Sequence, residues 1–320
     1  MNFNFQDVLG RLGIRRGEND KCGVIEVRPD GLRFVLVDKL KGLVTKCQVF
    51  NIEERQKYTN ERLLADLTDL VRHYGLKDAE CGIVLHPSYY RLHVVDVPDV
   101  PRSEYRKAAR WQLRDIIDLP LEDICLDVFL GEPGRGSERL YVVSARKQQL
   151  QGLVDCFVMA GLQVKFLDVR EFAIRNLLVR MYGVQGVWSA ACLDDEQCAM
   201  QVTSNGYLQF VRRVPMEIDA VIHGDVTRFV SEVGRSWEYV NSEFALPRPG
   251  RLLIMPTVHL SIQILKELNE VLGTSVVPLH FEERHYKRLM LDGDFDSDAL
   301  EDCWAALGGS YRLLDFDGIE

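Results

Sequence analysis

The chain has 320 residues, of which 47% are hydrophobic and 27% charged, as expected for a globular protein that can bury its own core. The formal net charge of −9 excludes a general nucleic-acid binder, which needs a basic surface to displace counterions. Eight cysteines lie scattered without CxxC spacing, which predicts reduced, buried thiols in a cytosolic protein. No apolar run approaches the roughly 20 residues that span a bilayer, so we expect any membrane association to be peripheral or through a partner.

Residues 1–20 carry no secretory leader and are expected to form an N-terminal tail, either frayed or acting as a short amphipathic tether. The next part predicts three strands, a helix and a fourth strand. The helix is expected to begin with Asn60 as its N-cap and to end at Gly75. The strand-like runs are Cys22–Val27, Leu32–Asp38, Leu43–Phe50 and Gly82–His86.

The same order of elements returns in the second half of the chain. Helices are expected over about 225–243 and 259–272, the second ending before Gly273. The strand-like runs are Val187–Leu193, Gln197–Thr203, Tyr207–Val214, Arg251–Met255 and Ser275–Pro278. This repetition predicts an α/β protein of two related lobes, each with a βββαβα order.

An extra unit interrupts the first lobe. It contains a helix from Ser103, two strands, a second helix over about 146–160 and a strand at Gln163–Leu167. This βαββαβ-like content predicts an inserted subdomain at residues 93–167. The first lobe then comprises residues 21–92 and 168–184, and the second lobe residues 185–320.

Several short segments of the insert, and of the helix after it, form a pattern of many weak matches in one register. They are Val97–Pro101, Glu104, Ala108–Leu113, Leu119–Asp123, Asp127, Ala160–Leu162 and Asp168–Ile174. In these segments the chain resembles the PilM family of type IV pilus assembly proteins, and within it the branch for mannose-sensitive hemagglutinin (MSHA) pilus biogenesis. The similarity is strongest over about residues 95–180.

The resemblance implies the actin-like ATPase fold, with two ribonuclease-H-like lobes. It implies a cytosolic protein at the inner membrane, with a groove between first lobe and insert that binds the cytoplasmic tail of a PilN-like single-span membrane protein. A pilus assembly ATPase is a further partner in this expectation. Residues 89–94 read as an alternating strand that leads into the insert, so Tyr90, Leu92 and Trp111 are the expected partner-binding residues.

The loops that would hold a nucleotide in such a fold are altered. One turn in each lobe should clamp the phosphates with small residues, and an acid should hold magnesium. Glu26 keeps the acid, but Arg28 stands where the family has Gly, and Pro29 removes a backbone donor. The second turn, Asp194-Asp195-Glu196, is wholly acidic, and Pro256 stands where the adenosine-side loop should have Gly-Gly. We therefore expect a pseudo-ATPase without catalytic residues, with neither ATP nor magnesium as cofactor.

Two further clusters have simpler interpretations. Four arginines recur on one side of the insert's first helix, which favours a solvated face, with anionic lipid headgroups or an acidic partner as the alternative. They are Arg102, Arg106, Arg110 and Arg114. His280 and His285 flank two glutamates at a spacing unlike known zinc motifs, so we expect a solvated loop and no metal.

Three functions compete. The leading one is an adaptor in a pilus assembly platform. The second is an ATP-binding actin-like ATPase of the same platform, which would need a catalytic Asp beside intact phosphate loops. The third is the cytoplasmic component of a type II secretion platform, a protein that normally continues into a membrane span, which this sequence does not show.

Overall fold

The computed structural model describes residues 19–52, 58–117, 119–132, 138–193, 197–216, 221, 226–255 and 260–314. The chain divides into two compact units: residues 1–130, 139–173 and 290–320 form the first, and residues 131–138 and 174–289 the second. Most of the expected N-terminal tail lies outside the described residues. None of the helices in the described part of the chain is long and apolar enough to span a bilayer.

The first unit is built on a five-stranded sheet of order β3-β2-β1-β4-β8. Its strands are β1 (Lys21–Arg28), β2 (Gly31–Asp38), β3 (Leu43–Asn51), β4 (Glu80–Leu85) and β8 (Gln163–Val169). The first three are antiparallel, and β4 and β8 continue the sheet in parallel to β1. Strands β1, β2 and β4 are buried almost throughout, which explains their continuous apolar runs.

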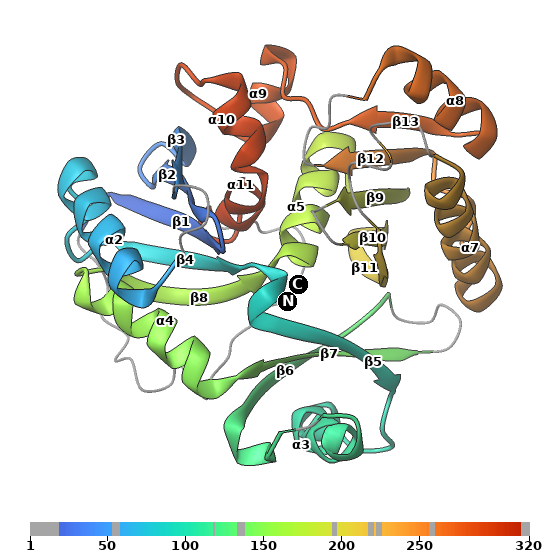
Figure 1. Ribbon diagram of the computed structural model, residues 1–320, viewed down its shortest axis with the longest axis horizontal. Coiled ribbons are helices and arrows are strands. Elements are labelled where there is room, and N and C mark those ends of the chain that lie inside the picture. The colour runs from blue at the N-terminus through green and yellow to red at the C-terminus, as the bar shows by residue number, and fades with distance from the viewer. Residues whose placement is uncertain are drawn as a thin grey trace. The chain divides into compact units, whose positions relative to one another are not determined.

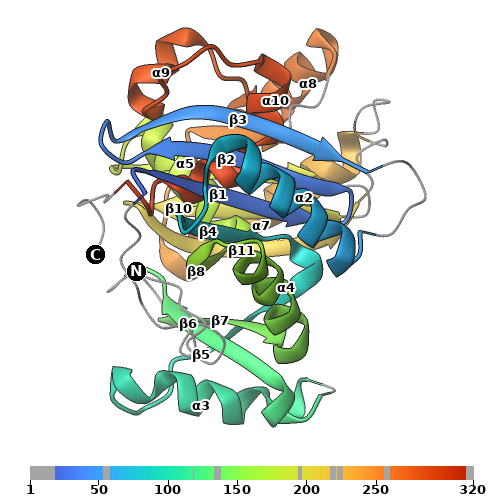
Figure 2. The ribbon, with the colours of Figure 1, turned by 90° about the vertical axis from the view of Figure 1, so that its left-hand side faces the viewer.

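Helices α2 (Asn60–Tyr74) and α4 (Lys147–Met159) lie side by side on this sheet (Figures 1 and 2). The N-cap of α2 is Thr59 rather than the expected Asn60, because the Thr59 hydroxyl accepts a hydrogen bond from Arg62 N. Gly75 ends the helix in the left-handed conformation, as expected. Helix α11 (Trp304–Ser310) packs against β1, β2 and β4, and α10 (Ser297–Asp302) packs against β3.

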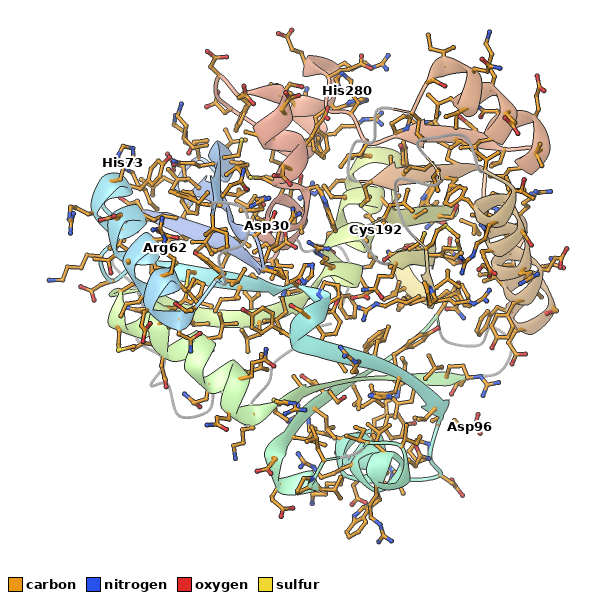
Figure 3. All side chains as sticks on the ribbon, in the orientation of Figure 1. Asp30, Arg62, His73, Asp96, Cys192 and His280 are labelled. Carbon is orange, nitrogen blue, oxygen red and sulfur yellow. The ribbon has the colours of Figure 1, made fainter. Side chains whose placement is uncertain are left out.

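The insert is a small sheet of order β5-β7-β6, covered on one face by helix α3 (Tyr105–Gln112). Its strands are β5 (Tyr90–Asp96), β6 (Ile124–Leu130) and β7 (Arg139–Arg146), all antiparallel. Its buried core comprises Ala109, Leu113, Leu126, Leu140 and Val142. Asp96, labelled in Figure 3, ends β5 and forms an ion pair with Arg139 of β7.

The boundaries of the insert and of the second lobe differ from those expected. Helix α4 and strand β8, placed in the insert at residues 93–167, belong to the five-stranded sheet, because β8 pairs in parallel with β4. Strand β5 belongs to the insert from Tyr90 onward. Residues 290–314, expected in the second lobe, belong to the first unit, and the division within α5 (Arg170–Tyr182) falls after Ala173.

The second unit repeats the topology of the first, with a sheet of order β11-β10-β9-β12-β13. Its elements are β9 (Val187–Leu193), β10 (Gln197–Ser204), β11 (Tyr207–Pro215), α7 (Val226–Phe244), β12 (Arg251–Met255), α8 (Ile262–Leu272), β13 (Ser275–Pro278) and α9 (Glu283–Leu289). Helices α7 and α8 cover one face of this sheet (Figure 1). The matching strand orders confirm the duplicated α/β arrangement.

The cysteines are distributed as expected for reduced thiols. All eight are thiols outside any disulfide, and seven of them are buried. Burial raises the pKa of the Cys22 thiol to about 12, so this side chain stays protonated and behaves as a small apolar group.

Candidate functional site: a pocket at the insert and an ion-pair network

The first unit contains a pocket of about 400 Å³ at the end of the insert sheet where β5 begins and β7 ends. One wall is apolar and consists of Ile116, Ile117, Leu119 and Ile124. The polar wall consists mainly of Arg91, His93, Ser144, Arg146 and Gln149. Because Gln149 lies on α4 and Ser88 and Tyr89 precede β5, the pocket joins the insert to the helix layer of the first sheet.

A histidine sits in the polar wall. A 2.9 Å hydrogen bond joins His93 Nε2 to Ser144 Oγ across the β5–β7 pair. Desolvation, and then repulsion from Arg91, lower the pKa of His93. The imidazole is therefore neutral at physiological pH and available as a hydrogen-bonding group.

The described lining of the pocket carries a charge opposite to that of the whole chain. Arg91 and Arg146 belong to it, and none of the lining residues that the structure describes is Asp or Glu. Both arginines are exposed, and Arg91 donates hydrogen bonds to the carbonyl groups of Pro87 and Tyr90. The pocket can therefore receive an apolar segment that carries a negative charge.

The three residues expected to bind the partner are not gathered at this pocket. Tyr90 lines it in part, but its side chain is buried and its hydroxyl donates a 2.5 Å hydrogen bond to Glu171 Oε2 on α5. Leu92 is half-buried and outside the lining. Trp111 is 66% exposed on α3 and also outside the lining.

The partner-binding roles of Tyr90, Leu92 and Trp111 stay predictions, and two further residues of β5, Arg91 and His93, line the pocket. Successive side chains of a strand point to opposite faces, so Arg91 and His93 face the pocket while Leu92 faces away. The apolar wall formed by Ile116 and Ile117 follows α3 in an irregular segment, where no periodicity marks it. Two consecutive isoleucines just after the end of an amphipathic helix were the available signal.

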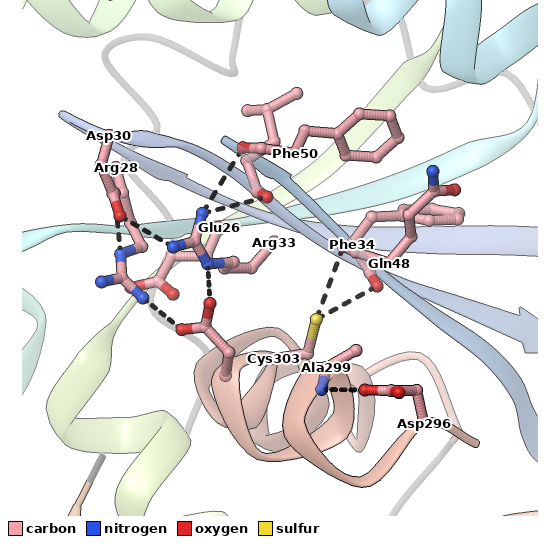
Figure 4. A network of polar contacts seen from close by, with 12 residues as sticks. Glu26, Arg28, Asp30, Arg33, Phe34, Gln48, Phe50, Asp296, Ala299 and Cys303 are labelled. Atoms are coloured by element: carbon pink, nitrogen blue, oxygen red, sulfur yellow. Dashed lines mark hydrogen bonds and ion pairs between the residues drawn. The ribbon is translucent and has the colours of Figure 1, made fainter. Parts of the chain in front are cut away.

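The first expected phosphate turn is occupied by a network of ion pairs (Figure 4). Arg28 Nη1 lies 2.8 Å from Asp302 Oδ1, and Arg33 Nε lies 2.7 Å from Asp302 Oδ2. Both arginines also contact Asp30 in the turn between β1 and β2. Burial alone would raise the pKa of the Asp30 carboxyl, but Arg28 and Arg33 outweigh it and lower that pKa. Pro29 begins this turn.

Glu26, the acid expected to hold magnesium, already has an internal cation. Its side chain is fully buried, and Oε1 lies 2.5 Å from Nε of the buried Arg170. The Arg170 guanidinium also lies 5.4 Å from the ring centre of Trp304 on α11. A guanidinium thus provides the positive charge that a metal ion would provide beside this carboxylate.

The other expected nucleotide loops, Asp194–Glu196 and Pro256, lie outside the described residues. Among the residues that are described, no group of three or more metal-binding side chains is close enough to hold an ion. His285 accepts a hydrogen bond from Glu282 N at the start of α9 through Nδ1.

No protein-family model matches the chain, and no curated protein matches it. Solved structures do. A chain of a PilM–PilN type IV pilus biogenesis complex is 17% identical, with a TM-score of 0.70 over 92% of this chain and 98% of that one. A protein of unknown function from Bacteroides thetaiotaomicron, described as having an actin-like ATPase fold, is 10% identical, with a TM-score of 0.51 over 83% of this chain and 94% of that one. This chain has the actin-like ATPase fold.

A third match is to a domain of a type II secretion system protein. The cytoplasmic domain of EpsL, an inner-membrane component of the type II secretion system of Vibrio cholerae, is 12% identical, with a TM-score of 0.51. The match covers 90% of this chain and 94% of that domain. Glu26 and the β1–β2 turn form the segment in which the sequence predicts the first phosphate loop. In this chain the side chains of that segment form the ion pairs described above.

Proposed function

We propose that the chain is a cytosolic adaptor of a type IV pilus assembly platform, held at the inner membrane by the cytoplasmic tail of a PilN-like single-span protein. The finer assignment, to the MshI-like branch of MSHA pilus biogenesis, rests on the sequence resemblance. The likeness to the PilM–PilN complex chain supports the general role. The pocket at the insert is the observation that carries it, because it is large enough for several side chains of an extended tail.

The pocket and the neighbouring strand suit an extended peptide. Strand β5 is an edge of the insert sheet, so a tail can add to it as a further strand. The isoleucines at one wall accept apolar side chains, and Arg91 and Arg146 favour a tail that brings a carboxylate.

We propose further that nucleotide binding is lost. Arg28 and Asp302 neutralise each other where phosphates would need backbone donors, and Arg170 neutralises Glu26. Binding Mg-ATP here would require these ion pairs to break, which leaves buried charges uncompensated. No catalytic role is assigned to any of these side chains.

The cytoplasmic tail of the PilN-like partner should bind, and Ile116→Asp should weaken that binding at least about tenfold, because a carboxylate enters the apolar wall. Fluorescence anisotropy of the labelled tail peptide measures the affinity. Ile262→Asp is the matched control, since Ile262 is 75% exposed on α8, outside the pocket. If the peptide fails to bind the wild-type chain, the partner assignment is wrong. Equal affinity in both variants would instead remove the pocket from the interface.

Millimolar Mg-ATP is expected to leave the melting temperature unchanged, since a ligand stabilises a protein only if the folded state binds it. Differential scanning fluorimetry with ATP, ADP and magnesium alone provides the comparison. A clear rise with Mg-ATP, absent with magnesium alone, would favour the alternative of an ATP-binding actin-like ATPase in the same platform.

A place in a type II secretion platform is the second candidate, favoured by the likeness to the EpsL domain. The tail experiment separates the two, because the platforms present different membrane partners.

A further inference from the structure

The outer side of α3 presents an exposed tryptophan between two basic residues. Lys107, Trp111 and Arg114 are spaced by four and three positions, so they share one helical face that continues into the 3₁₀ turn Leu113–Asp115. All three are exposed, with the Trp111 side chain 66% exposed. Ile116, just beyond the turn, lines the pocket described above and is not counted in this face.

This face differs from the arginine stripe expected from the sequence. Arg106 turns inward to Asp127 Oδ1 at 2.9 Å, and Arg110 donates to the carbonyl groups of Leu121 and Ile124. These two arginines therefore brace α3 against β6 and the segment before it. The outward charge comes instead from Lys107 and Arg114, on either side of the indole.

The segment is strongly basic within an acidic chain. Residues 102–115 contain five Lys or Arg, one Glu and one Asp, a net charge of +3. Since the whole chain carries −9, the remaining residues carry −12. An anionic surface would therefore repel most of the molecule and attract this face.

An anionic lipid surface fits these features better than a protein does. Indole rings prefer the boundary between headgroups and acyl chains, and basic side chains beside them contact anionic headgroups. A stable protein interface needs roughly 1,000 Å² or more with an apolar centre, whereas here one indole projects among charged side chains. We propose that the face formed by Lys107, Trp111 and Arg114 rests directly on anionic phospholipids.

This lipid contact goes beyond the binding of a partner tail and does not depend on it. The test uses the full chain with vesicles and no partner. In co-sedimentation, the wild type should bind vesicles of phosphatidylcholine with about 30% phosphatidylglycerol, and should not bind pure phosphatidylcholine. Lys107→Gln with Arg114→Gln should weaken binding about twenty-five-fold, about fivefold for each charge. Trp111→Ala should weaken it about tenfold.

A matched pair of controls carries the same chemical changes elsewhere. Lys266→Gln with Arg284→Gln removes two exposed charges from the second unit, and Ile262→Ala removes an exposed apolar side chain from α8. Both should bind like the wild type. Tryptophan fluorescence gives a second measurement: anionic vesicles should shift the emission to the blue in the wild type but not in Trp111→Ala. Of the other three tryptophans, Trp237 and Trp304 are buried, and Trp188 is half-buried on β9 in the second unit.

Three results would overturn the lipid assignment. The first is that the wild type ignores anionic vesicles. The second is that binding survives in the α3 variants but disappears on deletion of residues 1–18, which would assign lipid binding to the tail. The third is that the α3 variants bind anionic vesicles like the wild type but bind an acidic partner peptide more weakly.

Discussion

Replacing Arg170 with Met is expected to lower the free energy of unfolding by about 3–5 kcal/mol. The substitution leaves the Glu26 carboxylate fully buried without its cation, and also removes the contact with the Trp304 ring. A buried charge without a partner costs far more than the intact pair contributes, so the effect should be large. Chemical and thermal unfolding of the purified variant measure it.

Two companion variants make this prediction specific. Arg72→Met removes an arginine whose ion pair with Asp69 is exposed on both sides, and it should change stability by no more than about 0.5 kcal/mol. Glu26→Leu combined with Arg170→Met removes both charges and should recover most of the loss. If Arg170→Met alone costs less than about 1 kcal/mol, then water or another group compensates Glu26, and the replacement of a metal by this guanidinium is wrong.

Replacing Gly308 with Ala is expected to destabilise the protein by about 1–3 kcal/mol, although Ala is the better helix former. A Cβ at Gly308 would lie 2.3 Å from the Ala173 carbonyl oxygen and under 3 Å from two further backbone atoms of that residue. Backbone cannot rotate aside as a side chain can, so α11 would have to move away from the start of α5.

The matched control is Gly234→Ala on α7, where a Cβ meets no atom within 4 Å. There the same substitution should stabilise the protein by up to about 1 kcal/mol. Melting temperatures of the two variants should therefore move in opposite directions. A gain of stability in Gly308→Ala would mean that the close approach of α11 to α5 is not a tight constraint.

Local sequence signals located most of the elements. The order of strands and helices was read from apolar runs and turn residues, and its repetition predicted the two matching sheets. The assignment of α4 and β8 failed for a general reason: a helix followed by a strand can extend either of two neighbouring sheets, and the chain pattern is the same in both cases. The sequence did not single out Arg91 and His93 as pocket residues, because a short alternating strand does not reveal which face is covered.

The candidate site was only partly accessible from the sequence. Glu26, Arg28 and Pro29 could be recognised as an altered phosphate turn, because that judgement needs only residue types in a local segment. The partners of these charges could not be recognised, since Arg170 lies 144 positions from Glu26 and Asp302 lies 274 positions from Arg28. Nothing local in a sequence marks such distant pairs.

The sequence by itself therefore determined the repeated α/β lobes, the presence of an insert and the loss of small residues from the first turn, because each depends on local periodicity and residue chemistry. Only the tertiary structure decided that a guanidinium neutralises Glu26, that Arg91 and His93 face a pocket, and that Trp111 stays outside the core. The physical reason is that charge pairing, pocket lining and exposure depend on which distant segments pack together, and packing is a property of the whole chain.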